Sequence, residues 1–166
     1  MKHLKKSLFL LATALMLLSL AGCGRKNADL IDLGDSSLRY KSAYVVTDTT
    51  GMEEQEVLVV TFDFANNSAD PISYVGRVEE AAAQNGEALE HTSVFLDSDA
   101  SKQTSDTQLD AVASGATIEV STAFVLRDGT TSVELVLSRT DGTEGGSLTI
   151  DPTHLDRTRL FLSAVG

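Results

Sequence analysis

The alternation of apolar and polar side chains across residues 56–68 constrains the fold of this chain more than any other feature. The segment reads EVLVVTFDFANNS, and from Leu58 onward every second residue is bulky and apolar. A period of two, rich in β-branched and aromatic residues, predicts a strand with one buried face. Asparagine and serine at 66–68 then favour a turn, because their side chains hydrogen-bond their own backbone. We therefore expect the rest of the chain to cover this strand.

Further alternating segments predict the partners of that strand. The clearest is 116–126, where apolar and polar residues alternate almost without interruption. The other predicted strands are 38–47, 132–138 and 147–150. Short strands separated by turn residues indicate an all-β fold, an immunoglobulin-like β-sandwich of antiparallel strands. Its central seam is expected to contain Phe62, Phe64, Ile118 and Phe124.

Two segments are compatible with more than one structure. Residues 77–84, RVEEAAAQ, have a helix-forming composition, yet the Asn85-Gly86 pair behind them is the strongest short signal for a hairpin turn. The tail, residues 154–166, fits either an edge strand or a short helix. The local sequence leaves both choices open.

The N-terminus has the features of an export signal that ends in a lipid-attachment site. Lysines precede an apolar run at 8–20, which is too short to cross a bilayer as a permanent helix. The run ends in Leu20, Ala21, Gly22 and Cys23, which resembles the bacterial lipobox. Small residues give the signal peptidase access, and only a thiol accepts the lipid, here a covalent diacylglycerol on Cys23. Two acyl chains suffice for stable anchoring to a lipid bilayer.

The predicted division of the chain follows from that site. Residues 1–22 are the lipoprotein signal peptide, residues 23–37 the lipidated cysteine and a flexible tether, and residues 38–166 the sandwich domain. Because Cys23 is the only cysteine, no internal disulfide can form. We expect the protein at the cell membrane, lipid-anchored on the extracytoplasmic face, with no cofactor besides the diacylglycerol.

The net charge of the chain excludes one class of partner. The full chain has a formal charge of −11, which becomes −14 without Lys2, Lys5 and Lys6 of the leader. A surface this acidic repels phosphate groups. Nucleic acid is therefore not expected as a partner.

Four segments together are similar to one bacterial family. They are VVTFDFANNS at 59–68, QNGEALE at 84–90, SGATIEV at 114–120 and FVLRDGTTSVEL at 124–135. They resemble lipoproteins with the immunoglobulin-like domain of unknown function 5067, found mainly in Gram-positive bacteria, over most of 38–137. The resemblance implies a hairpin at Gln-Asn-Gly and hence a strand at 77–84. Ser114, where the family has proline, and the alanines at 81–83, where it has bulkier residues, depart from the pattern.

The polar segment 92–112 contains the candidate metal ligands. Its sequence from 97 to 101 resembles the start of a calcium loop, but Lys102 and Gln108 replace the glycine and glutamate that such a loop needs. The candidate ligands for a hard cation are Asp97, Asp99, Asp106 and Asp110. With two histidines and no free thiol outside the leader, a zinc or copper site is not expected.

Motifs that would indicate catalysis are missing from the sequence. The chain has no G-x-S-x-G elbow, no phosphate-cradling glycine loop and no H-E-x-x-H. The adjacent acids at 53–54 and 79–80 would point to opposite faces of a strand, so neither pair forms an acid–base couple. We therefore expect no enzyme activity, and an uncharacterised hydrolase is the remote alternative.

A binding surface is the remaining candidate for function. Val57 and Val59 make the second face of the 56–68 strand unusually apolar, so either a neighbouring segment covers them or they form an interaction surface with Tyr74. Tyr40, Tyr44 and Tyr74 are candidates to rim a ligand site. We predict a binding module of the cell envelope with an unidentified protein or ligand partner. The alternative is a calcium- or small-ligand-binding accessory lipoprotein in transport or sensing.

Overall fold

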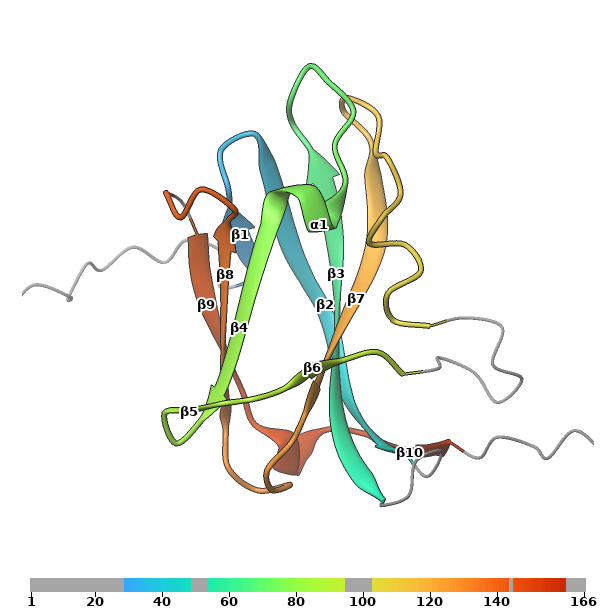
Figure 1. Ribbon diagram of the computed structural model, residues 1–166, viewed down its shortest axis with the longest axis vertical. Helices are drawn as coiled ribbons and strands as arrows, with labels where there is room; N and C mark the ends of the chain where they lie inside the picture. The colour runs from blue at the N-terminus through green and yellow to red at the C-terminus, as the bar shows by residue number, and fades with distance from the viewer. Residues whose placement is uncertain (1–28, 49–53, 95–102, 144, 161–166) are drawn as a thin grey trace, which may run out of the picture.

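Two β-sheets packed face to face make up the described part of the chain (Figure 1). The computed structural model describes residues 29–48, 54–94, 103–143 and 145–160. The strands are β1 (Leu30–Asp32), β2 (Ser36–Asp48), β3 (Gln55–Asn66), β4 (Val78–Gln84), β5 (Glu87–Ala88), β6 (His91–Thr92), β7 (Thr117–Val125), β8 (Val133–Arg139), β9 (Gly145–Ile150) and β10 (Arg157–Leu160). A one-turn helix, α1 (Tyr74–Arg77), precedes β4, and a 3-10 turn, η1 (Pro152–His154), precedes β10.

The strand order confirms the predicted all-β, immunoglobulin-like sandwich. Sheet A has the order β1-β2-β3-β7-β6, and β10 joins the outer edge of β2, the edge that faces away from β3. Sheet B has the order β5-β4-β8-β9. The pairing of β10 with β2 is parallel, whereas the other strand pairs of the described residues are antiparallel.

The predicted central seam forms the main core. The strand at its centre, β3, lies between β2 and β7 and contributes Phe62 and Phe64, both fully buried. Phe64 meets Tyr74 edge to face, with ring centroids 5.6 Å apart. Such an aromatic pair adds about 0.5–1.5 kcal/mol beyond the burial of its surface. From β7, Phe124 is buried in the same core, and the half-buried Ile118 packs against it.

The second face of β3 is also covered, so of the two predicted alternatives the cover by a neighbouring segment is confirmed and the interaction surface is wrong. Val57 and Val59 are 1% and 0% exposed. They form a second apolar cluster with Val46, Val94 and Ala123. Tyr74 is 1% exposed and belongs to the main core. Val94, just after β6, contributes to this cover from a segment with little apolar periodicity.

Residues 78–84 are a strand, as the family resemblance implies. β4 begins directly after α1 and pairs with β8 along its whole length and with β5 at its end. Asn85 and Gly86 have φ angles of 51° and 78°. A type I′ hairpin turn requires positive values at both central positions. Pairing with β8 therefore overrides the helical preference of the alanines.

The folded part of the chain begins before the predicted boundary at residue 38. β1 and the first residues of β2 lie in the segment 23–37 that is predicted as a tether. Leu33, between these strands, is 0% exposed. A three-residue strand is too short to show an alternation, so its burial depends on tertiary packing that the local pattern does not report.

The described part of the tail, up to residue 160, contains the edge strand of the two predicted alternatives, an edge strand or a short helix. After η1, β10 runs beside residues 45–48 of β2. Arg157 is paired with Glu56, and Arg159 Nη2 lies 2.5 Å from Glu54 Oε1. Two exposed ion pairs thus connect β10, across β2, with Glu56 of β3 and with Glu54 just before it.

Three connections around sheet B repeat the same turn. Asp128, Asp141 and Asp151 each accept hydrogen bonds from the backbone N–H and the hydroxyl of the threonine two residues later, at 2.6–3.0 Å. Asp128 also accepts from the Thr131 N–H at 2.6 Å. The bonds from Thr131 and Thr130 lower the pKa of Asp128 from 3.8 to about 2. These ionised carboxylates fix the turns between β7 and β8, β8 and β9, and β9 and β10.

Candidate functional site

Some of the predicted site residues lie outside the described part of the chain. They are the lipobox residues Leu20, Ala21, Gly22 and Cys23 and the candidate metal ligands Asp97 and Asp99. Lipidation of Cys23 and metal binding by these two aspartates therefore stay predictions.

The other two candidate metal ligands share a surface hollow. Asp106 and Asp110 line this hollow of about 520 Å³ together with Glu119 of β7. Asp106 Oδ2 accepts a hydrogen bond from the Gln103 N–H at 2.8 Å. Glu119 is paired with Lys41, whose Nζ lies 2.6 Å from its Oε2. Within the described ranges, no three His, Cys, Asp or Glu side chains are grouped so that they could hold a metal ion.

A hydroxyl, a carboxylate and an imidazole meet between the two sheets. Thr122 of β7 donates its hydroxyl hydrogen to Glu80 of β4, and His91 Nε2 of β6 lies 3.1 Å from the same hydroxyl oxygen. In a Ser-His-Asp triad the histidine lies between the other two groups, whereas here the hydroxyl does. Thr122 is 0% exposed. The cluster therefore ties the sheets together and does not present an accessible nucleophile.

Gln84 makes a second connection along the same edge of the sandwich. Its Nε2 donates to the Asp128 and Thr131 carbonyls at 3.0 and 2.7 Å. Its Oε1 accepts from the Arg127 N–H at 2.8 Å. The Gln84 side chain is 1% exposed, and its three bonds reach part-buried backbone groups of the β7–β8 connection. We call this edge, where β4 and β5 face β6 and β7, the closed edge; the chain from β5 to β6 also crosses it (Figure 1).

The opposite edge, where β9 faces the outer edge of β2, is open along part of its length. β1 closes one end, where Ile31 lies so close to Gly146 that a larger residue there would crowd it. η1 and Leu155 close the other end, on the way from β9 to β10. Between them lies a cleft of about 430 Å³, which we call the β2–β9 cleft. Pockets that bind small ligands have volumes of roughly 300–1,000 Å³.

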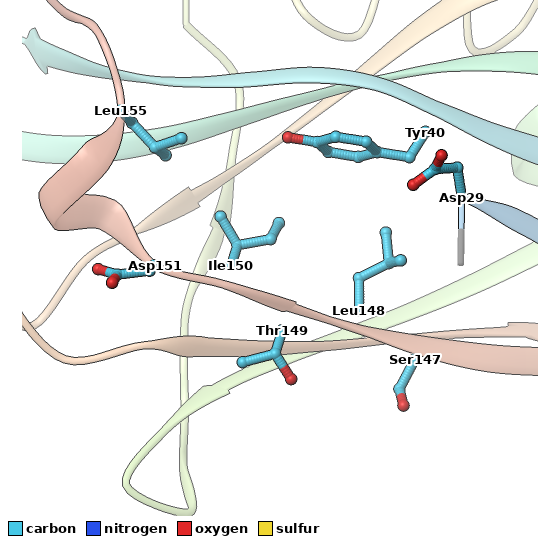
Figure 2. Close-up of a pocket in the computed structure, with 8 residues that line it drawn as sticks. All are labelled: Asp29, Tyr40, Ser147, Leu148, Thr149, Ile150, Asp151 and Leu155. Atoms are coloured by element: carbon cyan, nitrogen blue, oxygen red, sulfur yellow. The ribbon is translucent and has the colours of Figure 1, made fainter. Parts of the chain in front are cut away.

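Apolar side chains from both sheets form the floor of this cleft. Leu148 and Ile150 point from β9 towards the ring of Tyr40 on β2, and Leu155 lies beyond the Tyr40 hydroxyl (Figure 2). Tyr40 itself rests edge to face on Phe62, with ring centroids 6.3 Å apart. Because Leu148 and Ile150 alternate with exposed residues along β9, the strand pattern places both on the side of the cleft.

Two carboxylates stand at the rim of the cleft. Asp29 lies beside Tyr40 at the β1 end, and Asp151 lies at the η1 end (Figure 2). Burial and then the charge of Asp29 raise the pKa of Tyr40, so its hydroxyl stays protonated. Bonds from Thr153 lower the pKa of Asp151, so its carboxylate stays ionised. No basic side chain is among the described residues that line the cleft.

Both strands beside the cleft have backbone edges without a neighbouring strand. On the outer edge of β2, pairing with β1 ends where the Tyr40 N–H donates to the Asp29 carbonyl at 2.7 Å. Pairing with β10 begins at Val45, whose N–H donates to the Asp156 carbonyl at 2.9 Å. Residues 41–44 between them, and the far edge of β9, have no strand neighbour in the part of the chain that the structure describes.

The three tyrosines predicted to rim a ligand site lie in three different places. Tyr40 lines the β2–β9 cleft, Tyr44 packs against the second apolar cluster, and Tyr74 is in the main core. Sequence reasoning missed Leu148 and Ile150 as cleft residues. The available signal was a strand, 145–150, that has no charged residue and ends at Asp-Pro, because exposed edge strands usually carry charges.

Comparison with known proteins identifies a family and a fold. The sequence model of a family described as "Domain of unknown function (DUF5067)" matches residues 23–139. No protein with a curated description matches the sequence significantly. None of the helices in the described segments is long and apolar enough to span a bilayer.

Two solved structures share the fold at low sequence identity, and each is described as a "putative lipoprotein". One, from Staphylococcus aureus subsp. aureus NCTC 8325, superposes with a TM-score of 0.63 at 11% identity, over 80% of this chain and 94% of its own. The other, ycdA of Bacillus subtilis subsp. subtilis str. 168, gives a TM-score of 0.56 at 14% identity, over 77% of this chain and 40% of its own. At these identities the likeness concerns the fold alone.

Proposed function

The chain belongs to the DUF5067 family, and from that premise we propose that it is a lipid-anchored binding protein of the cell envelope whose ligand occupies the β2–β9 cleft. The observation that carries this proposal is the cleft itself, a hollow between two strand edges that combines an apolar floor with polar and charged groups at its rim. Ligand sites are concave and mostly apolar with a few polar groups that orient the ligand.

The lipobox supports the anchoring part of the proposal. The family match begins at residue 23, the cysteine predicted to carry the lipid. Two proteins of the same fold are described as lipoproteins in the words quoted above. Asp29, at the rim of the cleft, is six residues from Cys23, and a chain of that length spans at most about 20 Å. A ligand in the cleft would then be held close to the membrane.

We propose that the protein binds its ligand without chemical conversion. Among the described residues that line the cleft, none has an imidazole, thiol or amine to serve as a base or nucleophile beside the hydroxyls. The hydroxyl of Thr122, next to His91 and Glu80, is buried away from the cleft. Both observations favour binding over a hydrolase.

Cross-linking in the intact cell tests the binding function. A photoreactive amino acid at Thr149, an exposed position beside the cleft, should give a discrete cross-linked product with the full chain. Leu148→Lys, which places an amine in the cleft, should abolish that product. Val136→Lys, on the exposed face of β8 in the same sheet, should leave it unchanged. An identical product with both variants, or no product at all, would refute a ligand in the cleft.

A separate experiment tests the anchor. Cys23→Ser should move the protein from the membrane fraction to the medium, and mass spectrometry of the native chain should find diacylglycerol on Cys23. Retention of Cys23→Ser in the membrane would contradict lipid anchoring.

A further inference from the structure

We propose that the ligand of the β2–β9 cleft is an extended polypeptide segment that carries basic residues beside an apolar one and pairs its backbone with β9. This inference rests on the proposed function, since it names the class of ligand that the same cleft receives. It is drawn from the strand edges, the shape of the floor and the charge of the rim.

The strand edge is the first reason. β9 is the last strand of sheet B, and its sequence, GGSLTI, has no charged side chain and no proline. Proteins usually protect such edges with charges, proline or bulges, because an exposed edge accepts another strand. The facing strand is protected in this way, since β2 has an irregularity of register between Tyr40 and Ser42. β9 is therefore the strand of the cleft that can accept an added strand.

The apolar floor of the cleft determines which side chains the added strand must have. Leu148 and Ile150 reach into the cleft from β9, and Tyr40 and Leu155 close it from the other side. Side chains of an added strand alternate between two faces, so every second one would enter the cleft. An aliphatic side chain there would bury apolar surface against these four residues. The remaining side chains would stand outside the floor, near the rim.

The negative charge of the rim favours a ligand with positive charge. Asp29 and Asp151 stand at the two ends of the cleft, and no basic residue lies between them among the described lining residues. The chain without its leader lysines has a formal charge of −14. A second copy of this chain would bring like charge to the same edge, which disfavours a β9-to-β9 dimer. Lysine or arginine on the incoming segment would instead meet Asp29 at one end and, at the other, Asp151, whose Oδ2 also contacts His154 Nδ1 at 3.0 Å.

Peptide binding to the full lipidated chain in nanodiscs of zwitterionic phosphatidylcholine tests the inference, with empty nanodiscs as the background. The probes are fluorescent seven-residue peptides that alternate valine with lysine or valine with glutamate. A third peptide has the valine–lysine sequence with the amides of one edge N-methylated. Two exposed carboxylates contribute modestly to the binding free energy of a basic peptide. We therefore expect the lysine peptide to bind about tenfold more tightly than the glutamate peptide. N-methylation should weaken binding by at least about tenfold, since it removes the donors of one strand edge.

Variants and cross-links locate the interaction. Asp29→Asn should weaken binding of the lysine peptide about two- to fivefold, whereas Glu79→Gln, an exposed acid on β4 away from the cleft, should have no effect. A photoreactive group at the central valine should label residues 145–150 and 41–44. Equal affinity for the lysine and glutamate peptides, equal affinity for the N-methylated peptide, labels elsewhere, or no binding would each overturn the inference. If the Thr149 cross-link in cells persists while the peptides fail, the cleft is a ligand site for another class of molecule.

Discussion

The two edges of the sandwich are closed by different means. At the closed edge, polar side chains reach from one sheet to the other, and Gln84, Glu80 and Thr122 bond to partners across the gap. At the open edge, the sheets are joined only at the ends, by β1 and by the η1 connection, in the part of the chain that the structure describes. The middle of that edge is apolar and lacks cross-sheet side-chain bonds among those observed.

The difference indicates how stability and binding are divided in the fold. A buried hydrogen-bond network is costly to disturb, because each group left without a partner pays its full desolvation penalty. A cleft with an apolar floor at a strand edge can exchange water for a ligand at a much smaller cost in free energy. We therefore expect substitutions at the closed edge to affect stability and substitutions at the open edge to affect binding.

Removal of Gln84 should have the largest effect on stability. Gln84→Ala leaves the Arg127 N–H and two loop carbonyls without their partner, so we expect a loss of about 2–4 kcal/mol in the free energy of unfolding. Gln55→Ala, at an exposed position at the start of β3, should change it by less than about 0.5 kcal/mol. Urea denaturation of both variants measures the difference. Similar midpoints for the two would mean that the closed edge is not held by this side chain.

Thr122→Val should have the next largest effect. The substitution keeps the shape of the side chain and removes the hydroxyl that contacts both Glu80 and His91, so we expect a loss of about 1–3 kcal/mol. Thr117→Val in the same strand, at an exposed position, is the matched control and should stay within about 0.5 kcal/mol. If Thr122→Val leaves the free energy of unfolding unchanged, the cluster of Thr122, Glu80 and His91 does not stabilise the closed edge.

Leu148→Lys should cost little stability although it changes an apolar residue of the cleft. Leu148 is only half-buried, and the lysine chain can lie along the floor with its amine at the rim. We expect a loss of about 1 kcal/mol or less by urea denaturation. A loss as large as that of Gln84→Ala would show that the open edge is as tightly packed as the closed one.

The smallest effect on stability is expected from protonation of the turn carboxylates that flank the two edges. Hydrogen bonds from Thr131 and Thr130 hold the pKa of Asp128 at about 2, and bonds from Thr153 lower that of Asp151. A lowered folded pKa means that the stabilisation is present above pH 4 and is lost as the pH falls, for Asp128 through about 2. Carbon-13 NMR titration of the carboxyl groups should give a midpoint near 2 for Asp128. A midpoint near 3.8 would show that the turn is open in solution.

Most of the sheet framework could be predicted from the sequence. The alternation in 56–68 and 116–126 locates β3 and β7, because their inward side chains need apolar neighbours on every second residue. Asn85-Gly86 locates the β4–β5 hairpin, although the alanines before it favour a helix. The Asp-Gly and Asp-Pro pairs at 128–129, 141–142 and 151–152 locate the turns of sheet B in the same way.

The candidate site could not be predicted in the same way. Its position depends on where β1 and β10 stop along the outer edge of β2, and neither short strand has a pattern of its own. The interaction surface at Val57 and Val59 was predicted wrongly for a related reason. Val94, which packs against them, lies in a polar segment. Local periodicity shows which face of a strand is apolar, but it does not show which distant segment packs there.

Photo-cross-linking from both edges of the intact, membrane-anchored chain tests the central claim most directly. The photoreactive residue is placed either at Thr149, beside the cleft, or at Ala88, an exposed position in β5 at the closed edge. If the open edge is the binding edge, the product forms from Thr149 and not from Ala88. Equal products from both positions, or a product from Ala88 alone, would contradict the account.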